Sequence, residues 1–128
     1  MSTPIVFFDI AGPDVPALAD FYAAVFGWKI APGPFPTTRS ISGVPVNSPL
    51  AGTIRQDPND GGPQSMRSVI YAGVEDVTAT LAKIAAHGGA IHAPRFEVPG
   101  VVVLGMFKDP AGNPMGLVEM QDGKAKIP

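Results

Sequence analysis

The chain has 128 residues, of which 45% are hydrophobic and 16% are charged, and its formal net charge is −2. A length and composition of this order are typical of one globular domain that builds a hydrophobic core. The small negative charge excludes the basic surface typical of nucleic-acid binding, and the absence of cysteine excludes disulfides, thiolate metal sites and a thiol nucleophile.

The N-terminal sequence carries no basic segment followed by a long apolar run, so it predicts no signal peptide. The longest apolar runs, such as VVVLGMF at 101–107, are too short to cross a bilayer. We therefore expect a cytoplasmic protein that binds neither a membrane nor nucleic acid.

The first part of the chain predicts a strand, a helix and three short strands. Residues 4–10 form an apolar run typical of a buried strand, interrupted by one carboxylate, Asp9. Asp14 is a natural N-cap for a helix, and Gly27 is suited to ending it. The helix carries an apolar stripe formed by Leu18, Phe21, Tyr22 and Val25. Short strands are predicted at 28–30, 37–42 and 48–54.

After a turn-rich connection at 55–66, the same order of elements returns. Residues 67–74 predict a strand, and Asp76 is a second helix N-cap. The second helix ends at the HGG sequence, 87–89, and its apolar stripe is formed by Val77, Leu81, Ile84 and Ala85. Strands are predicted at 90–93, 100–107 and 114–120, and a DPAGN turn joins the last two.

A shift of 62 residues superimposes the two helical segments without a gap, placing Asp14 on Asp76 and Gly27 on Gly89. This internal repeat predicts two βαβββ modules. Each module has one helix, which can cover one face of a sheet. We therefore expect an α+β fold in which the helices lie outside and the opposite sheet faces enclose a cavity.

The sequence resembles the vicinal oxygen chelate superfamily, which includes glyoxalase I, bleomycin-resistance proteins and extradiol dioxygenases. The resemblance covers residues 4–121, and its FGW sequence is similar to a glyoxalase-like branch. It is carried by DVPALADFYAAVFGW at 14–28, VEDVTATLAKIAAHGGAI at 74–91 and FKDPAGNPMGLVE at 107–119.

The resemblance implies one domain, made of module 4–54 and module 67–121 joined by linker 55–66. The modules are expected to form a cupped, incomplete eight-stranded barrel with the helices outside. Members of the superfamily are commonly dimers, so we expect a homodimer.

Metal enzymes of the superfamily place a His, Glu or Gln on the first strand of each module and an acid on the last strand. The resemblance maps the two first-strand positions onto Phe7 and Val69, and the last-strand acid onto Gly116. None of these residues can offset the dehydration of a divalent ion. The remaining position falls near 50–56, which holds no His, Asp or Glu. We therefore expect no metal and no other cofactor.

Other chemistry-bearing residues have ordinary structural interpretations. Glu119 could replace Gly116 only if it faced the same side of its strand, which alternation opposes. His87 ends a helix and His92 lies in a short strand, where surface roles are common. Arg95 and Glu97 are expected in a solvated loop before the long strand.

Strand alternation also predicts which residues line the cup. With positions 7, 69 and 116 facing inward, and residue 106 paired with 116 across the turn, the lining follows directly. The predicted pocket consists of Phe7, Asp9, Arg67, Val69, Tyr71, Leu104, Met106, Gly116 and Val118. A largely apolar lining with a few polar groups suits a small organic molecule. Asp9 and Arg67 either contact that molecule or pair with each other.

Two functions of different class follow. The first is a metal-free module that binds a small, partly aromatic compound, as the bleomycin-type resistance proteins do. The second is a metal-independent isomerase, lyase or epimerase, in which burial raises the pKa of Asp9 and makes it a general base, while Tyr71 serves as acid or oxyanion donor. A third hypothesis is an enzyme that binds a divalent metal and has an activity like that of lactoylglutathione lyase. The sequence leaves open whether the chain is an enzyme, what it binds and how a dimer is built.

Overall fold

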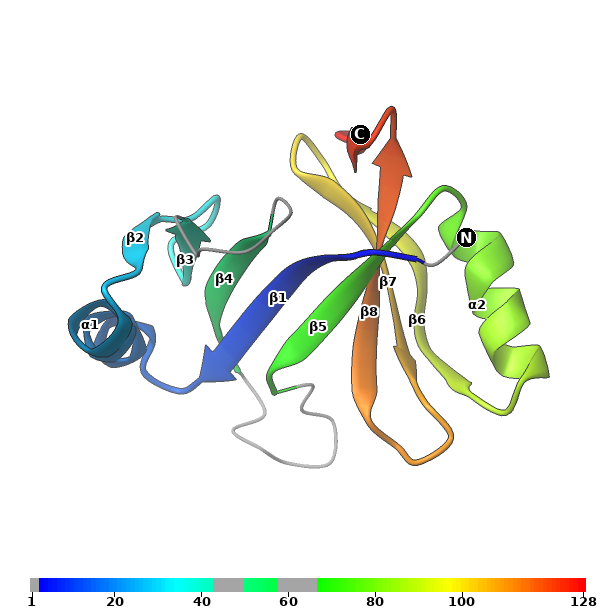
Figure 1. Ribbon diagram of the computed structural model, residues 1–128, viewed down its shortest axis with the longest axis horizontal. Coiled ribbons are helices and arrows are strands. Elements are labelled where there is room, and N and C mark those ends of the chain that lie inside the picture. The colour runs from blue at the N-terminus through cyan, green and yellow to red at the C-terminus, as the bar shows by residue number, and fades with distance from the viewer. Residues whose placement is uncertain (1–2, 43–49, 58–66) are drawn as a thin grey trace. The chain divides into compact units, whose positions relative to one another are not determined.

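The computed structural model describes residues 3–42, 50–57 and 67–128 (Figure 1). The chain divides into two compact units, which we call the N-terminal unit, Phe7–Val69, and the C-terminal unit, Met1–Val6 with Ile70–Pro128. In both units one helix follows the first strand and further strands complete a sheet. This confirms the predicted α+β class and the repeated order of elements.

The sheet of the N-terminal unit is built from four strands in the order β2-β3-β4-β1. β4 runs parallel to β1 and antiparallel to β3, which is antiparallel to β2. The elements are β1 (Ile5–Gly12), α1 (Val15–Phe26), β2 (Lys29–Pro32), β3 (Thr38–Ser42) and β4 (Ala51–Gln56). β4 therefore includes two residues that the sequence assigns to the linker, because their pairing with β1 continues to the strand end. Most of the predicted linker lies outside the described residues.

Both ends of α1 are set by the residues predicted to cap it. The side chain of Asp14 accepts a hydrogen bond from the backbone N–H of Ala17 at 3.0 Å. Gly27 takes a left-handed conformation with φ of 69°, and its N–H donates to the carbonyl of Ala23. These local signals satisfy backbone groups that the helix leaves unpaired.

The apolar stripe predicted for α1 is wrong for two of its four members. Phe21 is 54% exposed and Val25 is 56% exposed. The face packed on the sheet is formed by Val15, Leu18, Ala19 and Tyr22. Apolar residues surround most of this helix, so spacing alone left its orientation ambiguous. The small side chain of Ala19 belongs to the buried cluster that holds Ile41 and Ile54.

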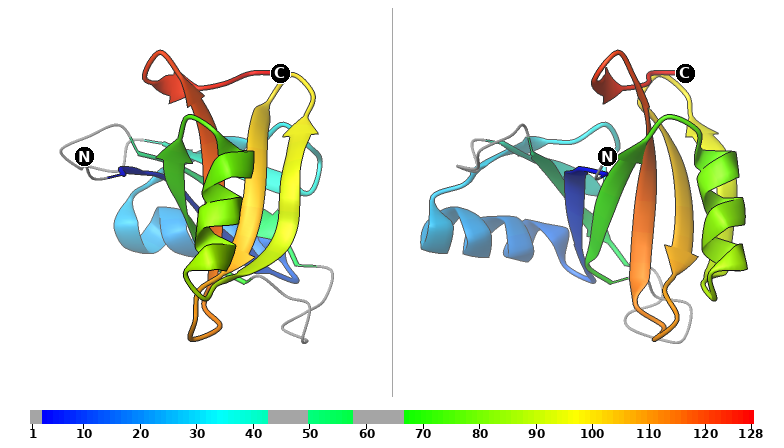
Figure 2. Two further views of the ribbon diagram at one scale, coloured as in Figure 1. Left: turned by 90° about the vertical axis from the view of Figure 1, so that its right-hand side faces the viewer. Right: turned by 45° about the vertical axis from the view of Figure 1, so that its right-hand side comes forward.

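In the C-terminal unit the sheet has the strand order β5-β8-β7-β6, with the short β9 paired to β8. α2 packs against β6, β7 and β8 (Figure 2). The elements are β5 (Val69–Val74), α2 (Val77–Ala86), β6 (Ala90–Val98), β7 (Val102–Lys108), β8 (Pro114–Gln121) and β9 (Lys124–Ala125). β9 was not predicted, because two residues carry no periodic signal.

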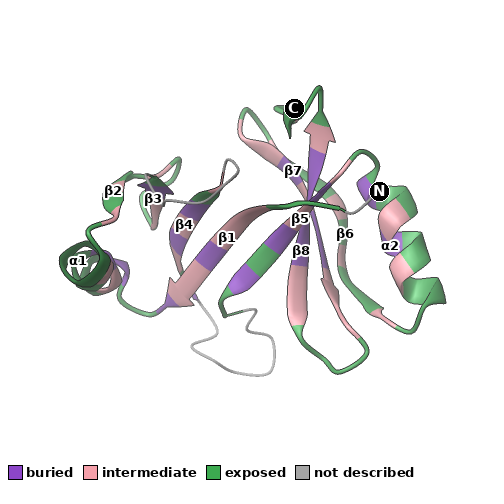
Figure 3. Cartoon of the chain, viewed as in Figure 1, coloured by how far each residue is buried: buried purple, intermediate pink, exposed green. Residues whose placement is uncertain are grey.

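α2 begins and packs as its sequence predicts. Asp76 accepts a hydrogen bond from the N–H of Ala79 at 2.9 Å, and Val77 and Leu81 are buried against the sheet. A Cβ atom at Gly105 would lie 2.6 Å from the side chain of Val77, so the glycine lets α2 approach β7 closely. Figure 3 shows the buried residues of this unit concentrated on β5, β7, β8 and α2.

The prediction of a loop at PRFEVPG is wrong, since β6 continues to Val98 and carries Arg95 and Glu97. Phe96 pairs with Leu104 on β7, but the register shifts between Ala93 and Phe96. Pro94 lies within this shift and has no N–H to donate, which explains why the sequence suggested a break.

No helix in the described ranges is both long enough and apolar enough to span a membrane.

Candidate functional site

Each sheet has one face packed by its helix, and we call the opposite side the helix-free face. In the N-terminal unit Phe8, Ile10 and Ile54 belong to the core packed with α1. Because side chains alternate along a strand, Asp9 on β1 and Arg55 on β4 lie on the helix-free face. The parallel register agrees, since Ala11 pairs with Arg55.

Asp9 and Arg55 form an ion pair across these two parallel strands. Asp9 is 4% exposed, and its Oδ2 lies 3.2 Å from Nε of Arg55. The Nη2 group of Arg55 donates to the backbone carbonyl of Arg67 at 2.6 Å. The guanidinium thus compensates the buried carboxylate and links β4 to the residues that precede β5.

Arg55 is a candidate site residue that the sequence did not reveal. The predicted strand ended at Ile54, which left Arg55 in the linker, and the sequence offered Arg67 as one alternative partner of Asp9. Only the parallel pairing of β1 with β4 brings positions 9 and 55 together. A signal existed in the alternation of β4, provided that the strand was extended by two residues.

The other predicted residues of the N-terminal unit occupy varied settings. Phe7 is half-buried and precedes Asp9 on the same face of β1, and Val69 is 2% exposed at the start of β5. Arg67 is exposed and has a positive φ of 46°.

In the C-terminal unit five predicted residues gather on the helix-free face. Leu117 packs toward α2, so Gly116 and Val118 face the opposite side. Gly116 pairs with Tyr71 on β5 and with Met106 on β7, and Val118 pairs with Leu104. The expected pairing of residues 106 and 116 is therefore confirmed.

The aromatic ring of Tyr71 lies directly over Gly116. A Cβ atom added at Gly116 would collide with ring carbons Cδ2 and Cε2 of this tyrosine, which is itself 5% exposed. Any larger residue at 116 would have to displace the ring. The position that the family resemblance assigns to a metal-binding acid is thus closed by a neighbouring side chain.

Glu119 lies on the other face of β8, as alternation predicts, and it joins several elements of the C-terminal unit. Its carboxylate accepts two hydrogen bonds from Arg95, at 3.0 and 2.9 Å, and one from the N–H of Val77 at 3.1 Å. Lys126 lies 3.5 Å away. The Arg95 hydrogen bonds, with help from Val77 and Lys126, lower the pKa of Glu119 from 4.5 to about 2. We interpret this network as structural, because it connects β6, β8, the start of α2 and the C-terminal residues.

The described residues contain no group of three His, Cys, Asp or Glu side chains that could hold a metal ion. His87 caps the C-terminal end of α2, and His92 is exposed on β6. Both placements agree with the structural interpretation made from the sequence.

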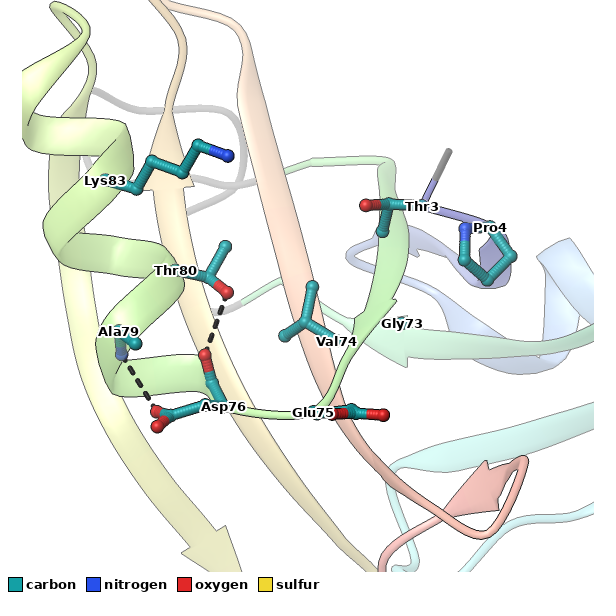
Figure 4. A pocket seen from close by; sticks show the side chains of 9 residues that line it. All are labelled: Thr3, Pro4, Gly73, Val74, Glu75, Asp76, Ala79, Thr80 and Lys83. Atoms are coloured by element: carbon teal, nitrogen blue, oxygen red, sulfur yellow. Dashed lines mark hydrogen bonds between the residues drawn. The ribbon is translucent and has the colours of Figure 1, made fainter. Parts of the chain in front are cut away.

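A shallow hollow of about 450 Å³ lies within the C-terminal unit, between Thr3 and Pro4, the end of β5 and the first turns of α2 (Figure 4). Asp76 is committed there to capping α2, and the hydroxyl of Thr80 donates to its backbone carbonyl at 2.8 Å. The lining consists of Thr3, Pro4, Gly73, Val74, Glu75, Asp76, Ala79, Thr80 and Lys83. It includes none of the residues predicted to bind a ligand.

Comparison with known proteins identifies one family and several relatives. The model of the Glyoxalase/Bleomycin resistance protein/Dioxygenase superfamily matches residues 5–117. The "Putative glyoxylase CFP32" of Mycobacterium bovis is 29% identical over 112 residues, or 85% of this chain. The "Anthracycline biosynthesis protein DnrV" of Streptomyces peucetius is 26% identical over 117 residues, or 82% of this chain. The matched part is 42% of each relative, so the chain spans about two fifths of their length.

Among solved structures, methylmalonyl-CoA epimerase in complex with methylmalonyl-CoA and NH4+ is similar, with a TM-score of 0.65 and 18% identity. That similarity covers 98% of this chain and 100% of the epimerase chain. The methylmalonyl-CoA epimerase of Mycobacterium tuberculosis has a TM-score of 0.64 and 13% identity, covering 91% and 87% of the two chains. Similarity at these identities establishes a shared fold.

Proposed function

The chain belongs to the glyoxalase/bleomycin resistance protein/dioxygenase superfamily, and on that premise we propose that it binds a small organic molecule without a metal ion. The observation that carries this proposal is the packing of Tyr71 over Gly116. A carboxylate at position 116 is what a metal site of the family would need. The tyrosine ring occupies the space into which such a side chain would extend.

The chemistry of the other mapped positions supports the same proposal. Phe7 and Val69 present hydrocarbon groups, which cannot replace the water molecules of a divalent ion. The residues at these positions therefore do not fit a metal, and we derive no reaction step through one.

The helix-free face of the C-terminal unit suggests the kind of ligand. Leu104, Met106 and Val118 lie there beside the ring of Tyr71, and such a surface suits an aromatic or aliphatic body. One relative is named for anthracycline biosynthesis, in keeping with a role on a small organic molecule. We expect the ligand to bury its apolar part on these side chains.

Binding is expected to be independent of divalent metal. In thermal-shift measurements against a library of small aromatic and aliphatic compounds, ligands should raise the melting temperature equally with and without EDTA, because binding only to the folded state stabilises it by RT ln(1 + [L]/Kd). Plasma mass spectrometry of the purified protein should find no stoichiometric metal. Full occupancy by zinc or nickel, or ligands that bind only when metal is added, would contradict the proposal.

A second candidate is a metal-independent isomerase or epimerase, with Asp9 as base and Tyr71 as acid or oxyanion donor. The burial of Asp9 and the epimerases among the structural neighbours favour it. Because the carboxylate of Asp9 is paired with Arg55, it is better suited to orienting the arginine than to accepting a proton. Asp9→Asn separates the two candidates if the ligands found in that screen are also assayed for chemical conversion: an enzyme should lose turnover and keep most of its ligand binding, whereas a binding module has no turnover to lose.

We also propose that the protein forms a homodimer. Phe21, Val25 and Phe26 are 54%, 56% and 58% exposed on α1, and apolar side chains gathered in this way often mark an interface. Light scattering should give the mass of two chains of 13.2 kDa. The mass of a single chain at micromolar concentration would exclude the dimer.

A further inference from the structure

The helix-free face of the N-terminal unit differs in chemistry from that of the C-terminal unit. Asp9 pairs in register with Thr53, and Thr53 pairs with Ser40, so these residues form one row across β1, β4 and β3. Arg55 lies two residues beyond Thr53 on the same face of β4. The face therefore carries two hydroxyl side chains and a guanidinium, where the other unit presents apolar side chains.

Arg55 is held in a fixed orientation and still reaches solvent. Its Nε lies 3.2 Å from Asp9, and its Nη2 donates to the carbonyl of Arg67 at 2.6 Å. Within the described ranges its Nη1 group makes no hydrogen bond, and the side chain is 25% exposed. A guanidinium oriented in this way loses little conformational entropy when it binds a further acceptor.

We propose that Arg55, together with the hydroxyls of Thr53 and Ser40, binds the carboxylate group of a small organic molecule on the helix-free face of the N-terminal unit. The inference goes beyond the proposed function, because it concerns the helix-free face of the N-terminal unit by itself and names small organic carboxylates as the ligand class. Asp9 is then a positioning residue, which holds the guanidinium toward the bound group.

A carboxylate fits this arrangement for two reasons. The Nη1 group of the guanidinium still offers N–H donors, and hydrogen bonds from a charged N–H to a carboxylate oxygen are stronger than neutral ones. The side chains of Thr53 and Ser40 on the same face add hydroxyl donors, and Oδ2 of Asp9 is already engaged by Arg55.

The test compares three carboxylates with their neutral carboxamides: benzoate with benzamide, phenylacetate with phenylacetamide, and hexanoate with hexanamide. Affinities are measured by calorimetry in EDTA at low salt. In the pairs that bind most tightly, the affinity of the wild-type protein for the carboxylate should be at least tenfold higher than for the carboxamide. Hydrogen bonds between charged groups are stronger than those between neutral groups. Arg55→Gln should reduce this preference to less than twofold while leaving carboxamide affinity within twofold.

Two further variants control the result. Arg39 pairs with Ile54 and so lies on the face that α1 covers, and Arg39→Gln should retain the full preference. Arg55→Gln alone leaves the buried Asp9 without this partner, which can prevent folding. The double variant Asp9→Asn/Arg55→Gln removes both charges, and it should also lose the preference for carboxylates.

Three outcomes would overturn the inference: carboxamides that bind the wild-type protein as tightly as carboxylates, a preference that survives in the Arg55 variants, or no binding by any of the six compounds. In the first two cases the probes still bind without metal, so the proposed function stands and only the role of Arg55 fails. In the third case the carboxylate inference fails, and the proposed function is decided by the broader library.

Discussion

Replacement of Glu119 by alanine is expected to lower the free energy of unfolding by about 3 kcal/mol, since the hydrogen bonds of a buried carboxylate to Arg95 and to the N–H of Val77 are lost together. Glu119 is 6% exposed and accepts hydrogen bonds from Arg95 and from the N–H of Val77. The variant would leave the guanidinium and the first turn of α2 without this acceptor. Urea unfolding at pH 7 measures the loss.

Glu97 provides a matched control on the same arginine. It lies 3.4 Å from Arg95 but its side chain is 51% exposed, so Glu97→Ala should change stability by less than about 0.5 kcal/mol. A loss of that small size for Glu119→Ala would show that the network does not stabilise the fold.

The same carboxylate predicts how stability depends on pH. The pKa of Glu119 is lowered from 4.5 to about 2 in the folded protein, first by the hydrogen bonds of Arg95. Its contribution is therefore complete above the unfolded pKa and is lost as the pH falls from about 5 toward 2. Glu119→Gln should flatten this part of the stability curve.

Gly116→Ala is the second substitution expected to have a large effect. The new methyl group would collide with the ring of Tyr71, and overpacking of this kind costs about 2 kcal/mol or more. Chemical unfolding of the variant should show that loss. The substitution also tests the proposed function, because a metal-binding acid at position 116 would collide with the same ring.

The background Tyr71→Ala supplies the control for this prediction. With the ring removed, Gly116→Ala should cost less than about 0.5 kcal/mol, so the two substitutions should be strongly non-additive. Equal costs in both backgrounds would show that the ring does not restrict position 116.

The family resemblance was confirmed over residues 5–117, and the order of elements followed from local signals. Asp14, Gly27 and Asp76 act on backbone groups three or four residues away, so their effects are visible in the sequence. Alternation likewise separated Glu119 from Gly116 correctly, because the period of a strand does not depend on its neighbours.

The errors arose where a residue's role depended on a distant partner. The spacing of apolar residues on α1 was compatible with more than one orientation, and packing against Ile41 and Ile54 selected the face that includes Ala19. Pro94 suggested a break in β6, but pairing with β7 carries the strand across it.

The repeated order of elements and the residues that cap both helices could be predicted from the sequence alone. Which charges meet became visible only in the folded protein. Arg55 is 46 residues from Asp9, and Arg95 is 24 residues from Glu119, so strand pairing sets both contacts. Local patterns specify how a segment folds, whereas the partner of a buried charge depends on which strands lie side by side.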